Sequence, residues 1–377
     1  MGSRKADVAR EHNGNTMSHT WVSVVLAFSA FAADDARDVV VATRRAGRVE
    51  IFDAGTLQPL GTIGVEPLAE SIQPSPDGRT LFIAQAMRSI PNSCCGLFAL
   101  NLETREMCFL REPAMRSTPS PDGRKLFFQR GNVGIEVQDA RTFKRLSTIQ
   151  APGVYALKPS PDGRWLLGIT NWKSPAVDIF DLTTNAMTRH IEIPQLSSSG
   201  GWVGDRFLLY GFDGHEGSLW TLTPSSTSLG EAVKVGAFPA LPQNCEPYGA
   251  NLAVSGGHSF LYELFGGKGD SGDNCGGRIP GGVFEIDAST GAMLTHLLPG
   301  MNFGRLAVSG DGEHLYGIVI SQGWTGVRLV DVERKSGEVI AERSLEDDVW
   351  NIALARIPSS LVPSGYSTPA ACSKTLP

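Results

Sequence analysis

The sequence predicts an all-β fold built from seven repeats, each a sheet of four antiparallel strands. Two motifs recur along the 377 residues: an apolar strand that ends in Asp or Asn, and a Pro-Ser-Pro-Asp-Gly turn that precedes another strand. Their spacing fits the period of about 40 to 50 residues that is typical of four-stranded repeat units. The repeat as a whole, rather than any single residue, therefore indicates the fold.

The first motif is an apolar strand whose last residue closes a turn. A terminal Asp or Asn can bond to the backbone two residues further on, and a nearby Thr supports the same geometry. Such a Thr stands at positions 56, 104, 142, 184 and 290. The copies, of which the fifth is degenerate, are Val49–Asp53, Leu97–Asn101, Ile135–Asp139, Val177–Asp181, Leu219–Leu222, Val283–Asp287 and Val327–Asp331.

The second motif is a hairpin turn that joins the first two strands of a repeat. It stands at Pro74–Gly78, Pro119–Gly123 and Pro159–Gly163, with a looser copy at Ser309–Gly312. Asp-Gly is a strong hairpin signal because Gly adopts positive φ without steric cost. The distance is 45 residues between the first two Asp-Gly pairs and 40 residues between the second and third.

The two ends of the repeat region predict a ring that closes without a covalent link. The chain enters the first repeat at Asp38 with its second, third and fourth strands, and no Asp-Gly hairpin precedes them. The segment Trp350–Ile357 has the pattern of the missing first strand. Pairing of this C-terminal strand with the N-terminal strands would leave no open sheet edge. We therefore predict a seven-bladed β-propeller over residues 34–358.

These motifs resemble the YVTN family of WD40-like β-propeller repeats, over about residues 38 to 357. That family is similar in fold to the β-chain of quinoprotein amine dehydrogenases and to bacterial lactonase propellers. The resemblance implies a scaffold and leaves the substrate open. It also implies two alternative functions: a lactonase-like hydrolase with its site at the axial channel, or a subunit of a periplasmic amine dehydrogenase-type redox complex. The second alternative needs another chain, because this sequence shows no cofactor attachment site.

Composition restricts the class of partner. The formal net charge is −6 and the pI is about 5.7, with Lys and Arg dispersed along the chain. Nucleic-acid binding requires clustered cations, so we expect none. The hydrophobic fraction of 41% is sufficient for cores between blades. We expect a monomer unless the chain is part of a complex, with a protein or a small molecule as its partner.

Residues 1–33 form an N-terminal extension that contains a candidate signal peptide. The apolar run Trp21–Ala33 is too short for a stable membrane span. Ala30-Phe31-Ala32 fits a secretory cleavage site and predicts a periplasmic or secreted protein. Translation could start at Met1 or Met17, and a disordered extension is the alternative interpretation. At the other end, residues 359–377 are rich in Ser, Pro and Thr, which predicts a disordered tail.

Six cysteines suit an oxidising compartment. We predict a disulfide between Cys245 and Cys275, because their two connections emerge on the same face of the propeller. The pairing of the remaining cysteines, at positions 94, 95, 108 and 372, stays open, although Cys108 is expected to lie too far along its strand to reach the adjacent pair easily. No Cys-x-x-Cys motif supports a zinc or thioredoxin site.

Irregular loops indicate where binding residues would lie. If the strands of a blade are lettered A to D in chain order, the loops between B and C emerge on the face opposite the Asp-Gly hairpins. The irregular B-to-C loops are residues 87–95, 171–175, 212–217, 266–282 and 321–326. Loops of varied length on a rigid scaffold are typical binding sites, so this face is the predicted functional face.

Three groups of candidate residues fall on this face. Asp213, His215 and Glu216 form a cluster that suits acid–base work or metal binding, or else a solvated turn. Asp270 and Asp273 lie in a Gly-rich loop whose spacing fails the EF-hand pattern. Trp172, Trp324 and Trp350 suit either ligand recognition or packing between blades.

The sequence lacks a nucleophile elbow, a haem attachment motif and an ordered set of Ser, His and Asp. His190, His258, His296 and His314 fall in or beside strands of the repeat, where they are interpreted as surface or filling residues. The predicted function is an exported, non-catalytic propeller without cofactor or metal, which binds a protein partner or a small ligand on its B-to-C face.

Overall fold

The computed structural model divides the chain into two compact units, Met1–Asp34 and Asp35–Pro377. Within the second unit it describes residues 36–44, 46–65, 69–85, 96–111, 117–130, 133–170, 176–193, 196–212, 217–222, 233–237, 245–255, 258–267, 282–287, 290, 292–320, 326–345 and 349–371. The predicted signal segment Trp21–Ala33 lies outside the described residues. Within them, no helix is long and apolar enough to cross a bilayer.

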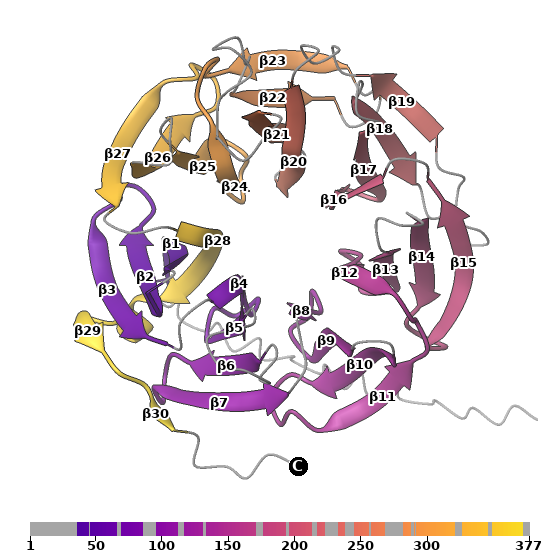
Figure 1. Ribbon diagram of the computed structural model, residues 1–377. Helices are drawn as coiled ribbons and strands as arrows, with labels where there is room; N and C mark the ends of the chain where they lie inside the picture. Colours follow the sequence, from indigo (N-terminus) through magenta and orange to yellow (C-terminus); the bar gives the residue numbers. More distant parts are fainter. Residues whose placement is uncertain are drawn as a thin grey trace, which may run out of the picture. The chain divides into compact units, whose positions relative to one another are not determined.

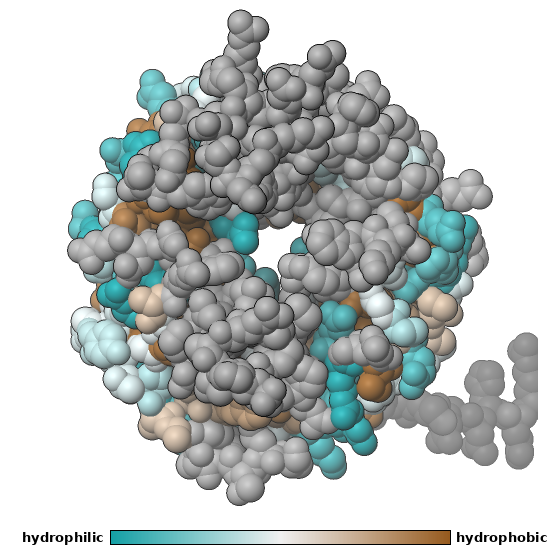
Figure 2. Space-filling model, in the orientation of Figure 1, coloured by the Kyte–Doolittle hydropathy of each residue, from teal (hydrophilic) through white to brown (hydrophobic). Residues whose placement is uncertain are grey.

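The second unit is a ring of seven antiparallel sheets, which confirms the predicted seven-bladed β-propeller (Figure 1). Each sheet is one blade, with strand A nearest the centre and strand D at the rim. The ring has an opening at its centre (Figure 2).

The blades are numbered from the N-terminal end of the ring. Blade 1 contains β28 (Val349–Pro358), β1 (Ala36–Arg44), β2 (Arg48–Asp53) and β3 (Pro59–Gly64); blade 2 contains β4 (Ala69–Pro74), β5 (Thr80–Gln85), β6 (Leu97–Asn101) and β7 (Glu106–Arg111). Blade 3 contains β8 (Ser117–Pro119), β9 (Lys125–Arg130), β10 (Gly134–Asp139) and β11 (Arg145–Ile149); blade 4 contains β12 (Val154–Pro159), β13 (Trp165–Thr170), β14 (Ala176–Asp181) and β15 (Ala186–Glu192).

The remaining three blades follow in chain order. Blade 5 contains β16 (Leu196–Val203), β17 (Arg206–Phe212), β18 (Gly217–Leu222) and β19 (Val233–Ala237). Blade 6 contains β20 (Cys245–Ser255), β21 (His258–Gly267), β22 (Val283–Ile286) and β23 (Met293–Leu297). Blade 7 contains β24 (Phe303–Val308), β25 (His314–Ile320), β26 (Val327–Glu333) and β27 (Val339–Leu345).

The Asp-Gly hairpins share one hydrogen-bond pattern. In blade 2 the Ser75 hydroxyl bonds to Asp77 at 2.6 Å, and the backbone N–H of Thr80 donates to the same hydroxyl at 2.9 Å. Blades 3, 4 and 7 repeat these bonds. The hairpin glycines have φ between 67° and 77°, a conformation that favours Gly, as the motif predicted. They are Gly78, Gly123, Gly163 and Gly312.

Pairing of the two ends closes the ring. β28 pairs antiparallel with β1 from Ala36↔Pro358 to Arg44↔Val349, so the C-terminal strand becomes strand A of blade 1. This pairing confirms the non-covalent closure that the sequence predicts. The polypeptide therefore has no A-to-B hairpin in blade 1.

Alternating side chains of the strands form the cores between blades. In β1, Val39 and Val41 pack towards blade 2, whereas Val40 and Ala42 pack towards blade 7. The described residues form seven apolar clusters, one at each junction between blades. The core is therefore divided among the junctions, as strand alternation predicts.

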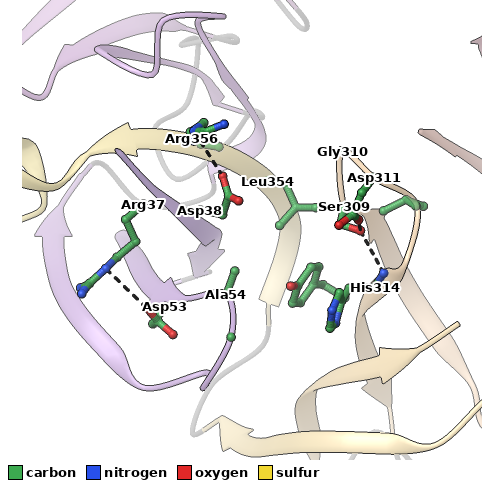
Figure 3. A pocket seen from close by; sticks show the side chains of 14 residues that line it. Arg37, Asp38, Asp53, Ala54, Ser309, Gly310, Asp311, His314, Leu354 and Arg356 are labelled. Carbon is green, nitrogen blue, oxygen red and sulfur yellow. Dashed lines mark hydrogen bonds and ion pairs between the residues drawn. The ribbon is translucent and has the colours of Figure 1, made fainter. Parts of the chain in front are cut away.

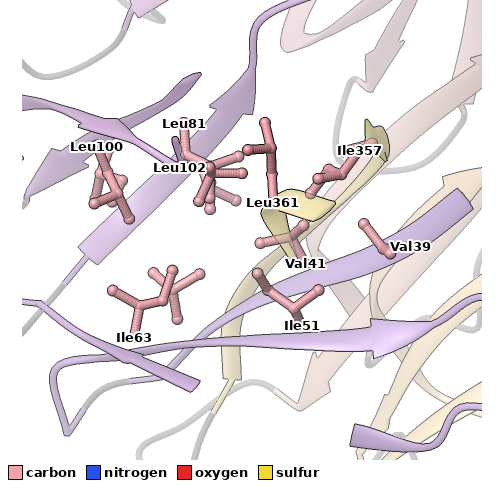
Figure 4. Packing of buried hydrophobic residues seen from close by; sticks show 13 residues of the cluster. Val39, Val41, Ile51, Ile63, Leu81, Leu100, Leu102, Ile357 and Leu361 are labelled. Carbon is pink, nitrogen blue, oxygen red and sulfur yellow. The ribbon is translucent and has the colours of Figure 1, made fainter. Parts of the chain in front are cut away.

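The C-terminal tail differs from the predicted disordered segment. Residues 359–371 contain a short 3-10 helix, η2 (Ser359–Leu361), and two strands that add in parallel to the rim, β29 (Gly365–Ser367) on β3 and β30 (Ala370–Ala371) on β7. Leu361 is 8% exposed and packs into the cluster between blades 1 and 2 (Figure 4). Its carbonyl oxygen accepts a hydrogen bond from Arg105 at 3.0 Å.

Replacing Leu361 with Ala tests whether the tail stabilises the ring. Burial of Leu361 in an apolar cluster predicts a loss of about 2 to 4 kcal/mol in the free energy of unfolding, measured by urea denaturation. Leu294→Ala is the matched control, because Leu294 lies on the rim strand β23 and is 57% exposed. Equal effects of the two substitutions would contradict a stabilising tail.

Candidate functional site

The predicted B-to-C residues fall outside the part of the chain that the structure describes. This applies to Trp172, Asp213, His215, Glu216, Asp270, Asp273 and Trp324, and to the side chain of Trp350, whose backbone belongs to β28. The B-to-C face therefore stays a prediction.

The predicted Cys245–Cys275 disulfide also lies outside the described side chains, although the backbone of Cys245 begins β20. Cys108, in β7, is disulfide-bonded, and no other cysteine has a described side chain. The partner of Cys108 lies outside the described side chains.

The described residues form a pocket of about 920 Å³ on the opposite face, where the Asp-Gly hairpins emerge. It lies between blade 7 and blade 1 (Figure 3). Blade 7 contributes its A-to-B hairpin and the start of β25, whereas blade 1 contributes the start of β1, the turn after β2 and the end of β28. The lining residues include Asp38, Ala54, Gly310, Asp311, His314 and Tyr316.

The missing hairpin of blade 1 explains why a pocket forms at this junction. The hairpins of blades 2 and 7 pack closely on the blade that precedes each of them: a Cβ on Gly78 would clash with the Arg356 carbonyl group, and a Cβ on Gly312 would lie 2.5 Å from the His258 ring. In blade 1 two separate chain segments replace the hairpin, so among the described residues no A-to-B hairpin packs on the hairpin of blade 7.

A histidine in the wall of the pocket bonds to a buried carboxylate that does not itself line the pocket. His314 Nδ1 lies 3.1 Å from Asp331 Oδ1. The His314 side chain is 36% exposed, whereas that of Asp331 is fully buried, and Asp331 Oδ2 has no hydrogen-bond partner. When a neutral His314 donates its Nδ1 proton to an ionised Asp331, Nε2 is a hydrogen-bond acceptor.

Sequence reasoning missed this pair because it placed the end of the strand two residues too early. Asp331 was expected to close the turn after Val327–Val330, but β26 continues to Glu333. Glu333 pairs with His314, as Asn101 pairs with Thr80 in blade 2. The signal was present in Ser336 and Gly337, which follow Glu333 at the spacing where Thr56 and Leu57 follow Asp53.

Carboxylates give the pocket a negative character. Burial raises the pKa of the Tyr316 phenol, and the charges of nearby carboxylates, with Asp331 the strongest, raise it further. Burial also raises the pKa of the Asp331 carboxyl, although the hydrogen bond and the charge of His314 act in the opposite direction. The hydrogen bond from Ser309 lowers the pKa of Asp311, so that carboxyl is ionised at neutral pH.

Two exposed arginines lie at the mouth of the pocket, each beside a carboxylate. Arg37 Nε lies 3.5 Å from Asp53, and Arg356 Nε lies 3.9 Å from Asp38. Such exposed pairs contribute little stability, because water screens them. Within the described residues, no group of three His, Cys, Asp or Glu side chains has the arrangement of a metal site. The geometry suits binding of a small polar molecule.

Comparison with known proteins supports the fold. No protein-family model and no curated protein matches the sequence. The chain is a seven-bladed β-propeller. Hydrazine synthase of Kuenenia stuttgartiensis is 14% identical, with a TM-score of 0.54 over 80% of this chain and 90% of that chain.

Two further solved structures are similar in fold. Apo AztD from Citrobacter koseri is 12% identical, with a TM-score of 0.53 over 85% of this chain and 98% of that chain. A protein from Bacteroides fragilis that is assigned as a 6-phosphogluconolactonase is 14% identical, with a TM-score of 0.55 over 86% and 99% of the two chains. At these identities the likeness extends to the fold alone.

The raised pKa of Asp331 predicts a pH-dependent effect of Asp331→Asn. The folded state favours the protonated carboxyl, so Asp331 stabilises the fold less as the pH rises from near its ordinary pKa of 3.8 towards neutrality. The free energy of unfolding of the variant, relative to the wild type, should therefore increase over this range in urea denaturation. Asp205→Asn, at an exposed turn, controls for the loss of one carboxylate. A relative stability that falls with rising pH would contradict the prediction.

Proposed function

We propose that this protein is an exported, non-catalytic propeller that binds a small molecule in the pocket between blades 7 and 1. The observation that carries the proposal is the pocket itself: about 920 Å³ lies within the usual range for small-molecule sites. Rigid strands on both sides of the junction hold its walls, which reduces the entropic cost of binding.

The polar groups of the pocket support binding rather than chemistry. Asp311 accepts a hydrogen bond from Ser309 within the hairpin, and the carboxylates of the exposed Asp38 and the half-buried Asp53 lie beside arginines. These groups serve as fixed hydrogen-bonding and charged partners around a mixed apolar and polar space. The B-to-C face, with Trp172, Asp213, His215, Glu216 and Trp324, is proposed as a second surface, for a protein partner.

Blocking the mouth of the pocket tests small-molecule binding. Gly310→Trp places an indole at the rim, and a Cβ at this position meets no atom within 4 Å, so the fold should tolerate it. We expect compounds that raise the Tm of the wild type, in a thermal-shift screen of cationic, anionic and neutral fragments, to lose this effect in Gly310→Trp. Pro161→Trp, at the equivalent exposed position of blade 4, is the control and should behave as the wild type. Hits that survive Gly310→Trp would place binding elsewhere.

Export is supported by the apolar run with its Ala30-Phe31-Ala32 site and by the oxidised state of Cys108. N-terminal sequencing of protein recovered from the periplasm or the medium should begin at Ala33. Intact Met1 or Met17 on cytoplasmic protein, with Cys108 open to alkylation, would overturn the export proposal.

A further inference from the structure

The junctions between blades can be compared with one another at two equivalent positions. The first position is the residue of strand C that pairs with the third residue of strand B, such as Asp331 opposite Tyr316. In blade 1, where β1 starts three residues earlier than the other B strands, this position is Ile51 opposite Val41. The second is the residue after strand C of the next blade, whose N–H donates to the carbonyl at the start of strand B, as Ala54 donates to Asp38 at 3.1 Å. At four junctions the two side chains pack in one apolar cluster or form an ion pair, and the repeat places Asp331 and Ala54 at the equivalent positions of the fifth.

At most junctions with both positions described, the two residues match in character. The pairs are Ile51 with Leu102, Ala99 with Ala140, Val137 with Leu182, Glu285 with Arg334, and Asp331 with Ala54. Three pairs are apolar, and the fourth joins a carboxylate to a guanidinium. The fifth pair, at the pocket, combines the buried Asp331 carboxylate with the methyl group of Ala54.

The junction between blades 6 and 7 shows what is missing at the pocket. There Arg334 donates to Glu285 at 3.1 Å and to Glu313 at 3.2 Å, and His258 bonds to Glu285 at 2.9 Å. The junction between blades 7 and 1 keeps equivalents of the other three groups: Asp331 for Glu285, His314 for His258, and Asp38 for Glu313. Ala54 replaces the arginine, and the pocket occupies the space in front of it.

We infer that the ligand of the pocket is an organic cation whose guanidinium or ammonium group takes the place that Arg334 occupies at the neighbouring junction. This inference rests on the proposed small-molecule function and names its ligand class. His314 Nε2 and Asp38 accept its N–H groups at the pocket wall, and Asp331 stabilises the charge from behind. Asp331 has a free Oδ2 and is fully buried, and an uncompensated carboxylate in such a place attracts a cation strongly.

Calorimetric titration with butylguanidinium, its uncharged isostere butylurea, and pentanoate tests the charge preference. We expect butylguanidinium to bind the wild type at least about tenfold more tightly than butylurea, which corresponds to ~1.4 kcal/mol, and pentanoate to bind more weakly still. Asp38→Asn, at an exposed position, should weaken the cation severalfold and butylurea much less, because the Asn carbonyl still accepts N–H bonds but carries no charge. Equal binding of cation and isostere, or preferential binding of pentanoate, would overturn the inference.

Ala54→Arg tests the equivalence of the two junctions without any ligand. An arginine at position 54 should pair with Asp331 and Asp38, raise the Tm of the empty protein and abolish butylguanidinium binding. Ala54→Met fills the same space without charge, so it should block binding but not raise the Tm. If Arg and Met have the same effect on the Tm, or if Ala54→Arg still binds the cation, the inference fails.

The failure of this inference differs from a failure of the proposed function. An anionic or neutral fragment that binds the wild type and is lost in Gly310→Trp would refute the cation and keep the small-molecule site. Absence of any fragment sensitive to Gly310→Trp would refute both.

Discussion

Pairing of β28 with β1 is the interaction on which the ring depends. These two strands join the ends of the propeller through an antiparallel pairing that shifts register once, between Thr43 and Arg44, and without it both strands would expose open edges. They also supply side chains to the cores on both sides of blade 1: Val39 and Ile357 pack towards blade 2, whereas Val40 and Ile352 pack towards blade 7. Closure is therefore a matter of apolar burial as well as backbone hydrogen bonding. The tail extends it further, since Leu361 packs into the same cluster as Ile357.

The same closure creates the pocket. A blade made from one continuous segment has a hairpin between strands A and B, and in blades 2 and 7 that hairpin packs closely on the preceding blade. Blade 1 is made from both ends of the chain, so its A and B strands leave the hairpin face as separate segments that begin at Ala36 and end at Pro358. Within the described residues, the place where the ring is closed is thus also the place where no hairpin covers the preceding blade. A functional site at this point needs no additional loop, because topology alone leaves the space.

Much of the fold followed from the sequence because the repeat signals are local. The Ser-x-Asp-Gly hairpins and the turns after strand C depend on bonds between residues two to five positions apart, so each copy is visible in the sequence. The site depends on register instead. Side chains in a strand alternate with a period of two, so the pattern of inward-facing and outward-facing residues stays the same when the strand is predicted to end two residues too early. Asp331 is then taken for a turn residue, although it is buried within β26. The disorder predicted for the tail rested on its polar average composition, which hides the burial of Leu361 and Pro363 and the backbone pairing of residues 365–371 with β3 and β7.

The repeated architecture makes a departure from the pattern physically informative. Positions equivalent to Asp331 hold apolar residues in blades 1 to 3, and the carboxylate of blade 6 is neutralised by an arginine from the next blade. A buried carboxylate without such a cation lowers stability, and an apolar residue at the same place would remove that cost. His314 compensates in part, and it does so while directing its second nitrogen towards open space. A fold optimised for stability alone would match Asp331 with a cation, as it does Glu285. The mismatch instead leaves a buried negative charge beside an open pocket at the junction between blades 7 and 1. This combination favours a ligand that supplies the missing positive group.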